Sequence, residues 1–314
     1  MPDRTPTKVG REIFLAGLGL DLDSIEPWVI DRMVSMLDDQ DFHAGEVLFS
    51  RGDPPEFLYF MHDGEVRLTR EGRAPWTYRG RWLIGAYDAV SEQGRARDAV
   101  AVRDFHAMRV PAADWLDLLE DSPRLAHAAV LNVARGVAEL EKRVPGGLPQ
   151  SPAHHPGALR RLPAALSLLE RVAAMVDVSM LRGGGVQALV DLAADSQEVS
   201  FDLGSIVFPR GVQHQQLIVL VEGEVLSTRV DPALERRYGP GDVLGGVAAF
   251  GAPALAWESR ATTPGRGIAV DIEAWFELME EHFDMVRSTL SAILARRELL
   301  LDHLAEASGG IVLT

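Results

Sequence analysis

The sequence predicts an α+β protein with two tandem antiparallel β-roll (jelly-roll) domains, each flanked by N-terminal helices and a C-terminal amphipathic helix. Two observations predict this fold: one glycine-punctuated pattern occurs twice, and each copy consists of short apolar runs with frequent turns. The pattern runs from Gly45 to Val66 and returns, 159 residues later, from Gly204 to Val225. A repeat as long as a domain indicates a tandem duplication, because solenoid units are much shorter.

Each copy is built from short β-rich runs. Val47–Phe49 and Ile206–Phe208 are β-branched or aromatic runs close to glycines, which is typical of strands. Gly64 and Gly223 precede a Glu-Val pair and allow the positive φ of a tight turn. Strands this short, with turns this frequent, favour an antiparallel barrel or jelly roll over a βαβ sheet.

The bulk composition is that of an ordinary globular protein. The 314 residues are 47% hydrophobic and 25% charged, enough for two domains with cores of their own. The absence of cysteine excludes disulfides and thiolate chemistry. No apolar run approaches the roughly 20 residues that span a bilayer, and residues 1–5 lack a signal-peptide layout. We therefore expect a cytoplasmic protein without membrane contact. The net charge of −15 also argues against binding to nucleic acid.

Helical periodicity places helices on both sides of the first β unit. Apolar spacing predicts a helix over 24–37 before the β unit at 42–110, and a short helix over 114–119 after it. A longer helix is expected to begin at Ser122-Pro123, with serine as the N-cap and proline at the first helical position. The first domain is therefore predicted at residues 21–144.

A proline-rich segment separates the two copies. Residues 145–163 contain five prolines and three glycines, so they predict a linker before a second domain at 164–307. That domain repeats the order of helices and strands, and it ends in a helix with one apolar stripe. The stripe consists of Phe283, Val286, Leu290, Ile293, Leu300 and Leu304. Trp115 and Trp275 also repeat, and we interpret both as core residues.

A small Gly/Ala segment followed by an arginine occurs in each β unit. In the first domain it runs over 84–90 and is followed by Arg95-Ala96; in the second it runs over 241–249 and is followed by Arg260-Ala261-Thr262. A glycine that opens a short helix exposes backbone N–H groups suited to an anion. An arginine adds a permanently charged, bidentate donor. The pattern therefore predicts a phosphate site in each domain.

This order of features resembles the cyclic-nucleotide-binding domain, the family of the catabolite activator protein and the regulatory subunits of cAMP-dependent protein kinase. The resemblance covers residues 25–143 and 186–307. In that family the cassette is Phe-Gly-Glu-Leu-Ala, followed by Arg-Ala-Ala/Thr; the glutamate holds the ribose 2′-hydroxyl and the arginine holds the cyclic phosphate. The resemblance implies a cAMP or cGMP ligand. We expect no DNA-binding helix-turn-helix, since only seven residues follow the last predicted helix.

The resemblance also implies which residues contact the ligand. They are Gly85, Ala86, Tyr87, Arg95 and Ala96 in the first domain, and Gly245, Gly246, Val247, Ala248, Arg260, Ala261 and Thr262 in the second. Ala86 and Gly246 stand where the family has glutamate, so neither domain keeps that residue. Arg97 competes with Arg95 for the phosphate position, and Asp98 would disfavour an anion nearby. The second cassette also has about five more residues between its glycine and its arginine.

Two functions remain open from the sequence. The leading hypothesis is a non-catalytic regulatory or sensory protein that signals by ligand-driven movement of its closing helices. The alternative is a degenerate scaffold of the same fold that acts in protein–protein interaction without nucleotide. No catalytic triad, carboxylate pair or metal-ligand spacing points to an enzyme or a metal site, and His154-His155 lie in the linker. We expect an unidentified protein partner, and a homodimer through the last helix is a further prediction.

Overall fold

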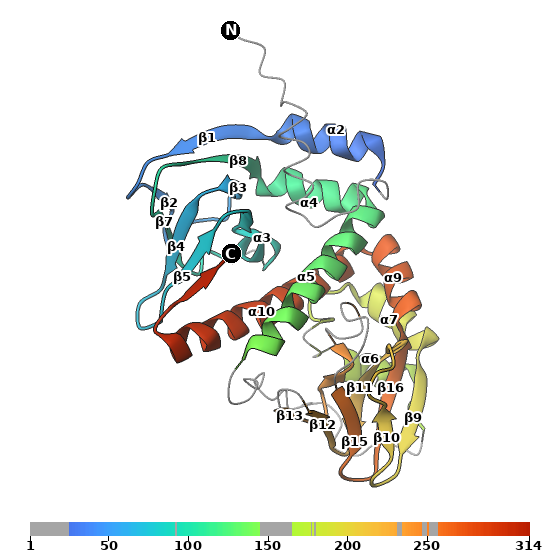
Figure 1. Cartoon of the computed structure of the whole chain (residues 1–314). Helices are drawn as coiled ribbons and strands as arrows, with labels where there is room; N and C mark the ends of the chain where they lie inside the picture. Colours follow the sequence, from blue (N-terminus) through green and yellow to red (C-terminus); the bar gives the residue numbers. More distant parts are fainter. Residues whose placement is uncertain are drawn as a thin grey trace. The chain divides into compact units, whose positions relative to one another are not determined.

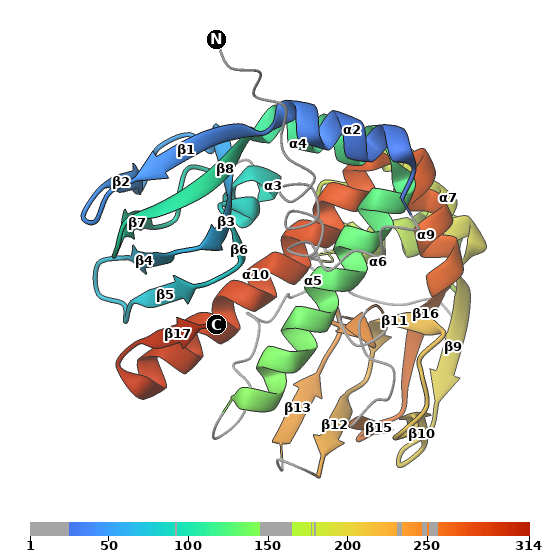
Figure 2. The ribbon, with the colours of Figure 1, turned by 45° about the horizontal axis from the view of Figure 1, so that its top comes forward.

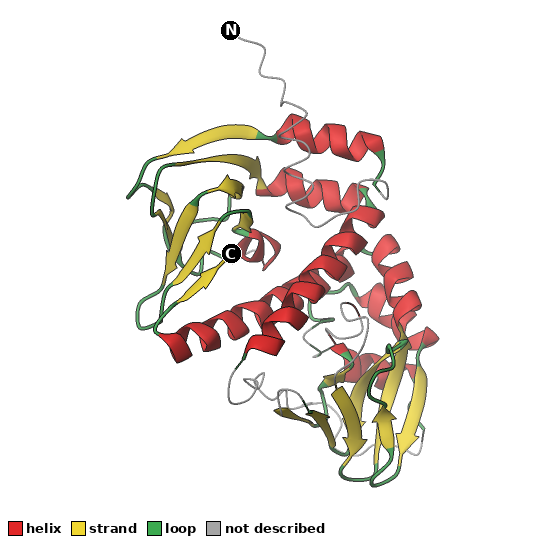
Figure 3. Cartoon of the chain, in the orientation of Figure 1, coloured by secondary structure: helices red, strands yellow, loops and turns green. Residues whose placement is uncertain are grey.

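The structure, a computed structural model, describes part of the chain (Figure 1). The described residues are 25–91, 93–144, 165–176, 178, 180–230, 234–246, 250 and 257–314. The chain divides into two units, one of Met1–Asn132 with Leu301–Thr314 and one of Val133–Leu300. Each unit contains one set of antiparallel strands with helices attached to it, as Figure 3 shows in yellow and red.

The unit boundaries differ from the domain limits expected from the sequence. They fall within two long helices, α5 (Pro123–Arg143) and α10 (Phe283–Ser308). The predicted linker at 145–163 lies outside the described residues. The domain limits at 144 and 164 therefore stay a prediction.

The first β-roll lies in unit 1. Its strands are β1 (Asp38–Phe42), β2 (Val47–Phe49), β3 (Phe57–Asp63), β4 (Glu65–Thr69), β5 (Trp76–Arg79), β6 (Trp82–Ile84), β7 (Asp98–Ala101) and β8 (Phe105–Pro111). Its helices are α2 (Pro27–Met36), α3 (Ala86–Ser91), α4 (Ala112–Asp121) and the start of α5. The strands form two sheets with the orders β1-β8-β3-β6 and β5-β4-β7-β2.

The second β-roll lies in unit 2. Its strands are β9 (Gln197–Phe201), β10 (Ile206–Phe208), β11 (Gln216–Glu222), β12 (Val225–Arg229), β13 (Leu234–Tyr238), β14 (Val243–Leu244), β15 (Trp257–Ala261) and β16 (Gly265–Asp271). Its helices are α6 (Leu168–Met175), α7 (Val186–Asp195), α9 (Ile272–Glu281) and most of α10. The sheet orders β9-β16-β11-β14 and β13-β12-β15-β10 match those of the first roll strand for strand. The predicted fold class and the duplication are confirmed.

One strand has no counterpart in the second roll. After α10 ends at Ser308, β17 (Ile311–Leu313) pairs in parallel with β5 and extends the second sheet of unit 1. Both views place the C-terminus beside this roll (Figures 1 and 2). Ile311 and Leu313 are buried and Val312 is exposed, the alternation of a strand with one covered face. This strand was not predicted from the sequence.

The N-cap and the first residue predicted for the long helix of the first roll are confirmed. Ser122 Oγ accepts a hydrogen bond from Leu125 N at 3.3 Å, so Ser122 caps α5 and Pro123 is its first residue. Trp115 and Trp275 are buried, which confirms them as core residues. No helix in the described part of the chain is long and apolar enough to cross a membrane.

Candidate ligand-binding site

The site in the first roll is organised around Gly85, between β6 and α3. Gly85 has φ of 91°, a conformation that favours glycine. A Cβ atom here would lie 2.3 Å from Nη1 of Arg95. The glycine is therefore required twice, by its backbone and by the arginine that lies against it.

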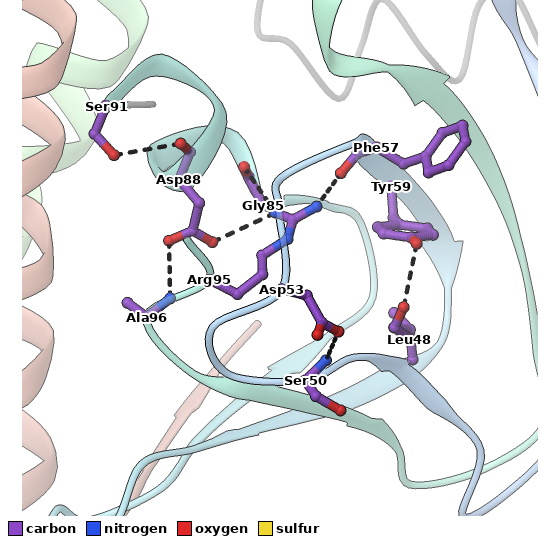
Figure 4. A network of polar contacts seen from close by, with 10 residues as sticks. All are labelled: Leu48, Ser50, Asp53, Phe57, Tyr59, Gly85, Asp88, Ser91, Arg95 and Ala96. Atoms are coloured by element: carbon purple, nitrogen blue, oxygen red, sulfur yellow. Dashed lines mark hydrogen bonds and ion pairs between the residues drawn. The ribbon is translucent and has the colours of Figure 1, made fainter. Parts of the chain in front are cut away.

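Arg95 is fixed from both its backbone and its side chain. Its N–H donates to Asp53 O at 2.8 Å and its carbonyl accepts from Gly52 N at 2.9 Å, which ties it to the turn after β2. Its side chain is only 2% exposed. The guanidinium donates to the carbonyls of Gly85, at 3.2 Å, and Phe57 (Figure 4). It also lies 4.1 Å from the centre of the Phe49 ring, a cation–π contact.

Asp88, on α3, supplies the anion for this arginine. Its Oδ2 lies 3.4 Å from Arg95 Nη1, and its Oδ1 accepts from Ala96 N at 3.2 Å (Figure 4). Burial raises the pKa of the Asp88 carboxyl, while the Ala96 N–H and the charges of Arg95 and Arg97 oppose that rise. The carboxylate thus takes two donors that a bound phosphate would otherwise receive.

A cavity of about 200 Å³ opens beside this group. It is lined by Leu48, Phe49, Asp53, Pro54, Glu56, Phe57, Tyr59 and Arg95. Tyr59 donates from its hydroxyl to Leu48 O at 3.2 Å, and burial raises the pKa of its phenol. The cavity is smaller than the roughly 300–1,000 Å³ of typical ligand pockets. A nucleotide would therefore have to displace side chains as it entered.

Arg97 does not face this cavity. Its guanidinium stacks 3.5 Å from the Trp76 ring and pairs with Asp302 of α10, which also pairs with Arg70 at 2.8 Å. Asp98 accepts from Arg51 N at 2.8 Å and is likewise engaged elsewhere. Of the two candidate arginines, Arg95 is therefore the one beside the cassette. The expected repulsion from Asp98 is replaced by pairing with Asp88.

The sequence of the first roll matches a known protein family. Residues 39–122 match the family model described as the cyclic nucleotide-binding domain. The first β-roll is a cyclic-nucleotide-binding domain. A curated relative, the cyclic AMP receptor protein of Thermus thermophilus, is 27% identical over 122 residues, which are 37% of this chain and 56% of that protein. The chain thus matches just over half of the length of this relative.

Solved structures also align with most of the chain. The regulatory domain of Toxoplasma gondii protein kinase A with cAMP covers 92% of this chain and 94% of its own, at 14% identity and a TM-score of 0.36. The regulatory subunit of a cAMP-independent protein kinase A from Trypanosoma brucei covers 93% and 90%, at 13% identity and a TM-score of 0.34.

Backbone hydrogen bonds align the second roll with the first. In the first roll, Gly45 N donates to Ala101 O at 2.8 Å and Ala101 N donates to Glu46 O at 2.9 Å. In the second roll, Gly204 and Ala261 repeat the first of these bonds at 2.9 Å, and Ala261 N donates to Ser205 O at 3.0 Å. Ala101 therefore corresponds to Ala261, an offset of 160.

This register corrects the prediction for Arg260. Arg260 pairs with Ile206 as Val100 pairs with Val47, so it corresponds to Val100 and not to Arg95. Its side chain is 48% exposed and donates to Gly204 O at 2.7 Å and to Glu258 at 2.8 Å. The neighbouring Ser259 and Ala261 are buried, so strand alternation turns Arg260 outward. The position that matches Arg95 is Leu255, which lies outside the described residues.

The other predicted residues of the second cassette are placed only in part. Gly245 has φ of 88°, as Gly85 does, and Gly246 follows it. Val247 and Ala248 lie outside the described residues. Thr262 donates from both its N–H and its hydroxyl to Glu224 O, at 2.9 and 3.2 Å, so it closes a turn. With Ala261 in the strand pairing, the Arg-Ala-Thr triplet is a structural element of the sheet.

A histidine occupies the place of the arginine in the second roll. Phe208 corresponds to Phe49, and the ring of His214 stacks on it with centroids 3.8 Å apart. A Cβ atom at Gly245 would lie 3.5 Å from His214 Nδ1, as one at Gly85 would meet Arg95. His214 is 6% exposed, and neither ring nitrogen has a hydrogen-bond partner among the described residues. Burial lowers its pKa to about 4.

Sequence reasoning missed Asp88 and His214. A comparison of the two copies could have indicated Asp88, because the second copy has an alanine, Ala248, at the corresponding position 160 residues later. His214 carries none, since it comes from the loop before β11 and not from the segment that contains Arg95. The described residues also contain no group of three or more metal-ligating side chains.

Proposed function

We propose that this chain is a regulatory protein without catalysis of its own, whose first β-roll receives the phosphate of a cyclic nucleotide, cAMP or cGMP, at Arg95. The observation that carries the proposal is the position of Arg95, with its guanidinium against Gly85 at the edge of a cavity in the family's domain. Gly85, Ala86, Tyr87, Arg95 and Ala96 would form the site. The name of the Thermus relative, a cyclic AMP receptor protein, is consistent with this function.

We assign the second roll a structural role in the same protein. Its only predicted phosphate arginine, Arg260, points outward, and leucine stands at the position that matches Arg95. A stacked, buried imidazole takes the corresponding space. One ligand per chain is therefore the expected stoichiometry.

We propose that the signal leaves the first roll through the C-terminal helix. Arg97 lies two residues after Arg95 on the same segment, and it holds Asp302 of α10. A ligand that shifts Arg95 would shift the segment before β7 that carries Arg97, and so weaken or strengthen the ion pair between Arg97 and Asp302 of α10. A ligand can drive this change only if it binds one of the two states more tightly.

Titration calorimetry with cAMP and with cGMP tests the proposal. The wild-type chain should bind one of them at one site, and Arg95→Ala should weaken binding by about 100-fold, the loss of two charge-assisted hydrogen bonds. Arg260→Ala is the matched control and should leave the affinity unchanged. Absence of binding tighter than millimolar, or an equal loss in both variants, would overturn the proposal.

The scaffold without nucleotide is the second candidate. It is favoured by the internal pairing of Arg95 with Asp88 and by Ala86 at the glutamate position. The partner would then be a protein. The predicted homodimer through the last helix is less favoured, since Leu290, Ile293 and Leu300 are already buried within the single chain. Light scattering of the full chain over a range of concentrations tests for a dimer.

A further inference from the structure

The Asp88 carboxylate of the first roll is bound as an anionic ligand would be bound. It is an anion held by the Arg95 guanidinium at 3.4 Å and by the Ala96 N–H at 3.2 Å. Both donors come from the segment that follows α3, whereas Asp88 comes from α3 itself (Figure 4). The pair is buried, with side-chain exposures of 2% for Arg95 and 12% for Asp88.

We infer that Asp88 is a built-in competitor that occupies the anion site of the first roll, and that it sets the affinity for an external phosphate. This inference rests on the proposed function of the same site. An entering phosphate must displace Asp88 from Arg95 and from the Ala96 N–H. The measured binding free energy is therefore the difference between the free energies with which phosphate and Asp88 interact with these two donors. The same contact would exclude weak anions.

The duplicated sequence supports this role. At the position that corresponds to Asp88, the second copy has Ala248, and at the position of Arg95 it has Leu255. The carboxylate and the arginine thus occur together in one roll and are both absent from the other. An unpaired buried charge is costly, so Asp88 also keeps Arg95 inside the roll when no ligand is bound.

Exchange of the two anions gives the affinity a definite pH dependence. Asp88 has a raised pKa, and the positive charges that act on it are those of Arg95 and Arg97. A protonated Asp88 is neutral and no longer competes for Arg95. Cyclic nucleotide binding should therefore tighten as the pH falls through the Asp88 pKa, because the phosphodiester keeps its charge.

The test is calorimetry of the full chain with cAMP, cGMP and inorganic phosphate, on wild type, Asp88→Asn and Asp88→Ala. Asp88→Asn removes the competing charge with little change of shape, and Asp88→Ala copies the second roll. We expect both variants to bind roughly tenfold more tightly than wild type, or better, as for one lost charge-assisted contact. The affinity of Asp88→Asn should also be flat where that of wild type rises at low pH.

Asp63→Asn is the matched control. Asp63 lies at the end of β3 outside the cavity, its side chain is 76% exposed, and its Oδ1 pairs with Arg103 at 2.6 Å. Its loss removes the same charge without freeing Arg95, so the affinity should stay within about threefold of wild type. Circular dichroism of each variant confirms that it is folded at the temperature of the titration.

The outcomes separate this inference from the proposed function. Tighter binding by Asp88→Asn and Asp88→Ala, with Asp63→Asn unchanged, supports the inference. If wild type binds and the folded Asp88 variants bind no more tightly, the inference is wrong and the proposed function stands. If no variant binds any of the three probes, both are wrong. Binding by the Asp88 variants alone would support the inference, with Asp88 closing the site in wild type, and would overturn nucleotide binding as the function of the wild-type chain.

Discussion

The two β-rolls share one strand order, and they differ in the group that lies on a single phenylalanine. In the first roll the Arg95 guanidinium lies over Phe49, with Asp88 as its anion. In the second roll the imidazole of His214 lies over Phe208. The first arrangement keeps a permanent positive charge at the cassette, whereas the second keeps a ring whose burial disfavours charge. The comparison teaches that one fold can place either a cation or a neutral ring on the same phenylalanine.

The rolls also differ at one sheet edge. In unit 1, β17 covers the edge strand β5, and Asp302 of α10 holds Arg97 next to Trp76. In unit 2, the corresponding strand β13 pairs only with β12 among the described strands, and Trp257 stands at the position of Arg97. The roll with the arginine is therefore also the roll that holds the end of the chain.

The largest expected effect on stability comes from removal of Asp302. Asp302→Ala leaves the Arg97 guanidinium buried without its carboxylate, which should cost about 3 kcal/mol of unfolding free energy. Urea unfolding followed by circular dichroism measures the loss. Hydrogen exchange should quicken at Trp76–Arg79 and stay unchanged at Leu234–Tyr238, because the contact lies in unit 1.

Glu306→Ala is the control, one turn further along the same helix. Its Oε1 accepts from Ala74 N at 3.1 Å and pairs with Arg73 at 3.9 Å, and both contacts are exposed, so the cost should stay below about 1 kcal/mol. An equal loss from both variants would mean that helix α10, and not the Arg97 contact, determines the stability of this region.

A second prediction concerns pH and the second roll. The folded-state pKa of His214 is about 4, below the ordinary 6.5 of the unfolded chain, so the unfolded state binds more protons between these values. The contribution of His214 to stability is complete above pH 6.5 and falls as the pH drops towards 4. The total loss is about 3 kcal/mol, from a shift of roughly 2.5 pKa units.

His214→Phe isolates this effect. The variant keeps a flat ring on Phe208 and removes two ring nitrogens that have no partner among the described residues. It should raise the unfolding free energy by about 1 kcal/mol at pH 7, and by more at pH 4.5. Urea titrations of both proteins at the two pH values measure the difference. If the gain is the same at both, His214 does not titrate in this window.

Third, the buried residues of β17 should matter and the exposed one should not. Leu313 is 2% exposed and Val312 is 46% exposed on the same strand. Leu313→Ala should cost about 2 kcal/mol, at the low end for a buried leucine because the site lies at a sheet edge. Val312→Ala should cost less than about 0.5 kcal/mol. Equal costs in urea unfolding would show that the pairing with β5 does not hold in solution.

The sequence could predict the fold because the duplication repeats its turns and strands. It could also place Arg95 beside Gly85, since that residue follows Gly85 at the family's spacing. It could not place Arg260. The Arg-Ala-Thr triplet matches the family's motif, but the strand register is set by the backbone pairing of Gly204 with Ala261, which the sequence does not show. In a strand, a shift of one residue turns a side chain to the other face.

Asp88, His214 and β17 could not be predicted for a related reason. Each depends on a partner far away in the sequence or on burial. The role of Asp88 follows from being enclosed with Arg95, and that of His214 from stacking on Phe208. Three residues at Ile311–Leu313 form a strand only because β5 offers them an edge. Local patterns carry no information on such contacts.

The smallest expected effect is in the ion pair of Arg260 and Glu258, the surface counterpart of Arg95 and Asp88. The side chains are 48% and 27% exposed at a separation of 2.8 Å, so water competes with the contact and salt screens it. A double-mutant cycle with Arg260→Ala and Glu258→Ala should give a coupling energy of at most about 0.5 kcal/mol, and less in high salt. The same cycle on Arg95 and Asp88 should give a larger, salt-insensitive coupling, because that pair is buried. Equal couplings would remove the distinction between an arginine in a surface ion pair and an arginine in a buried one.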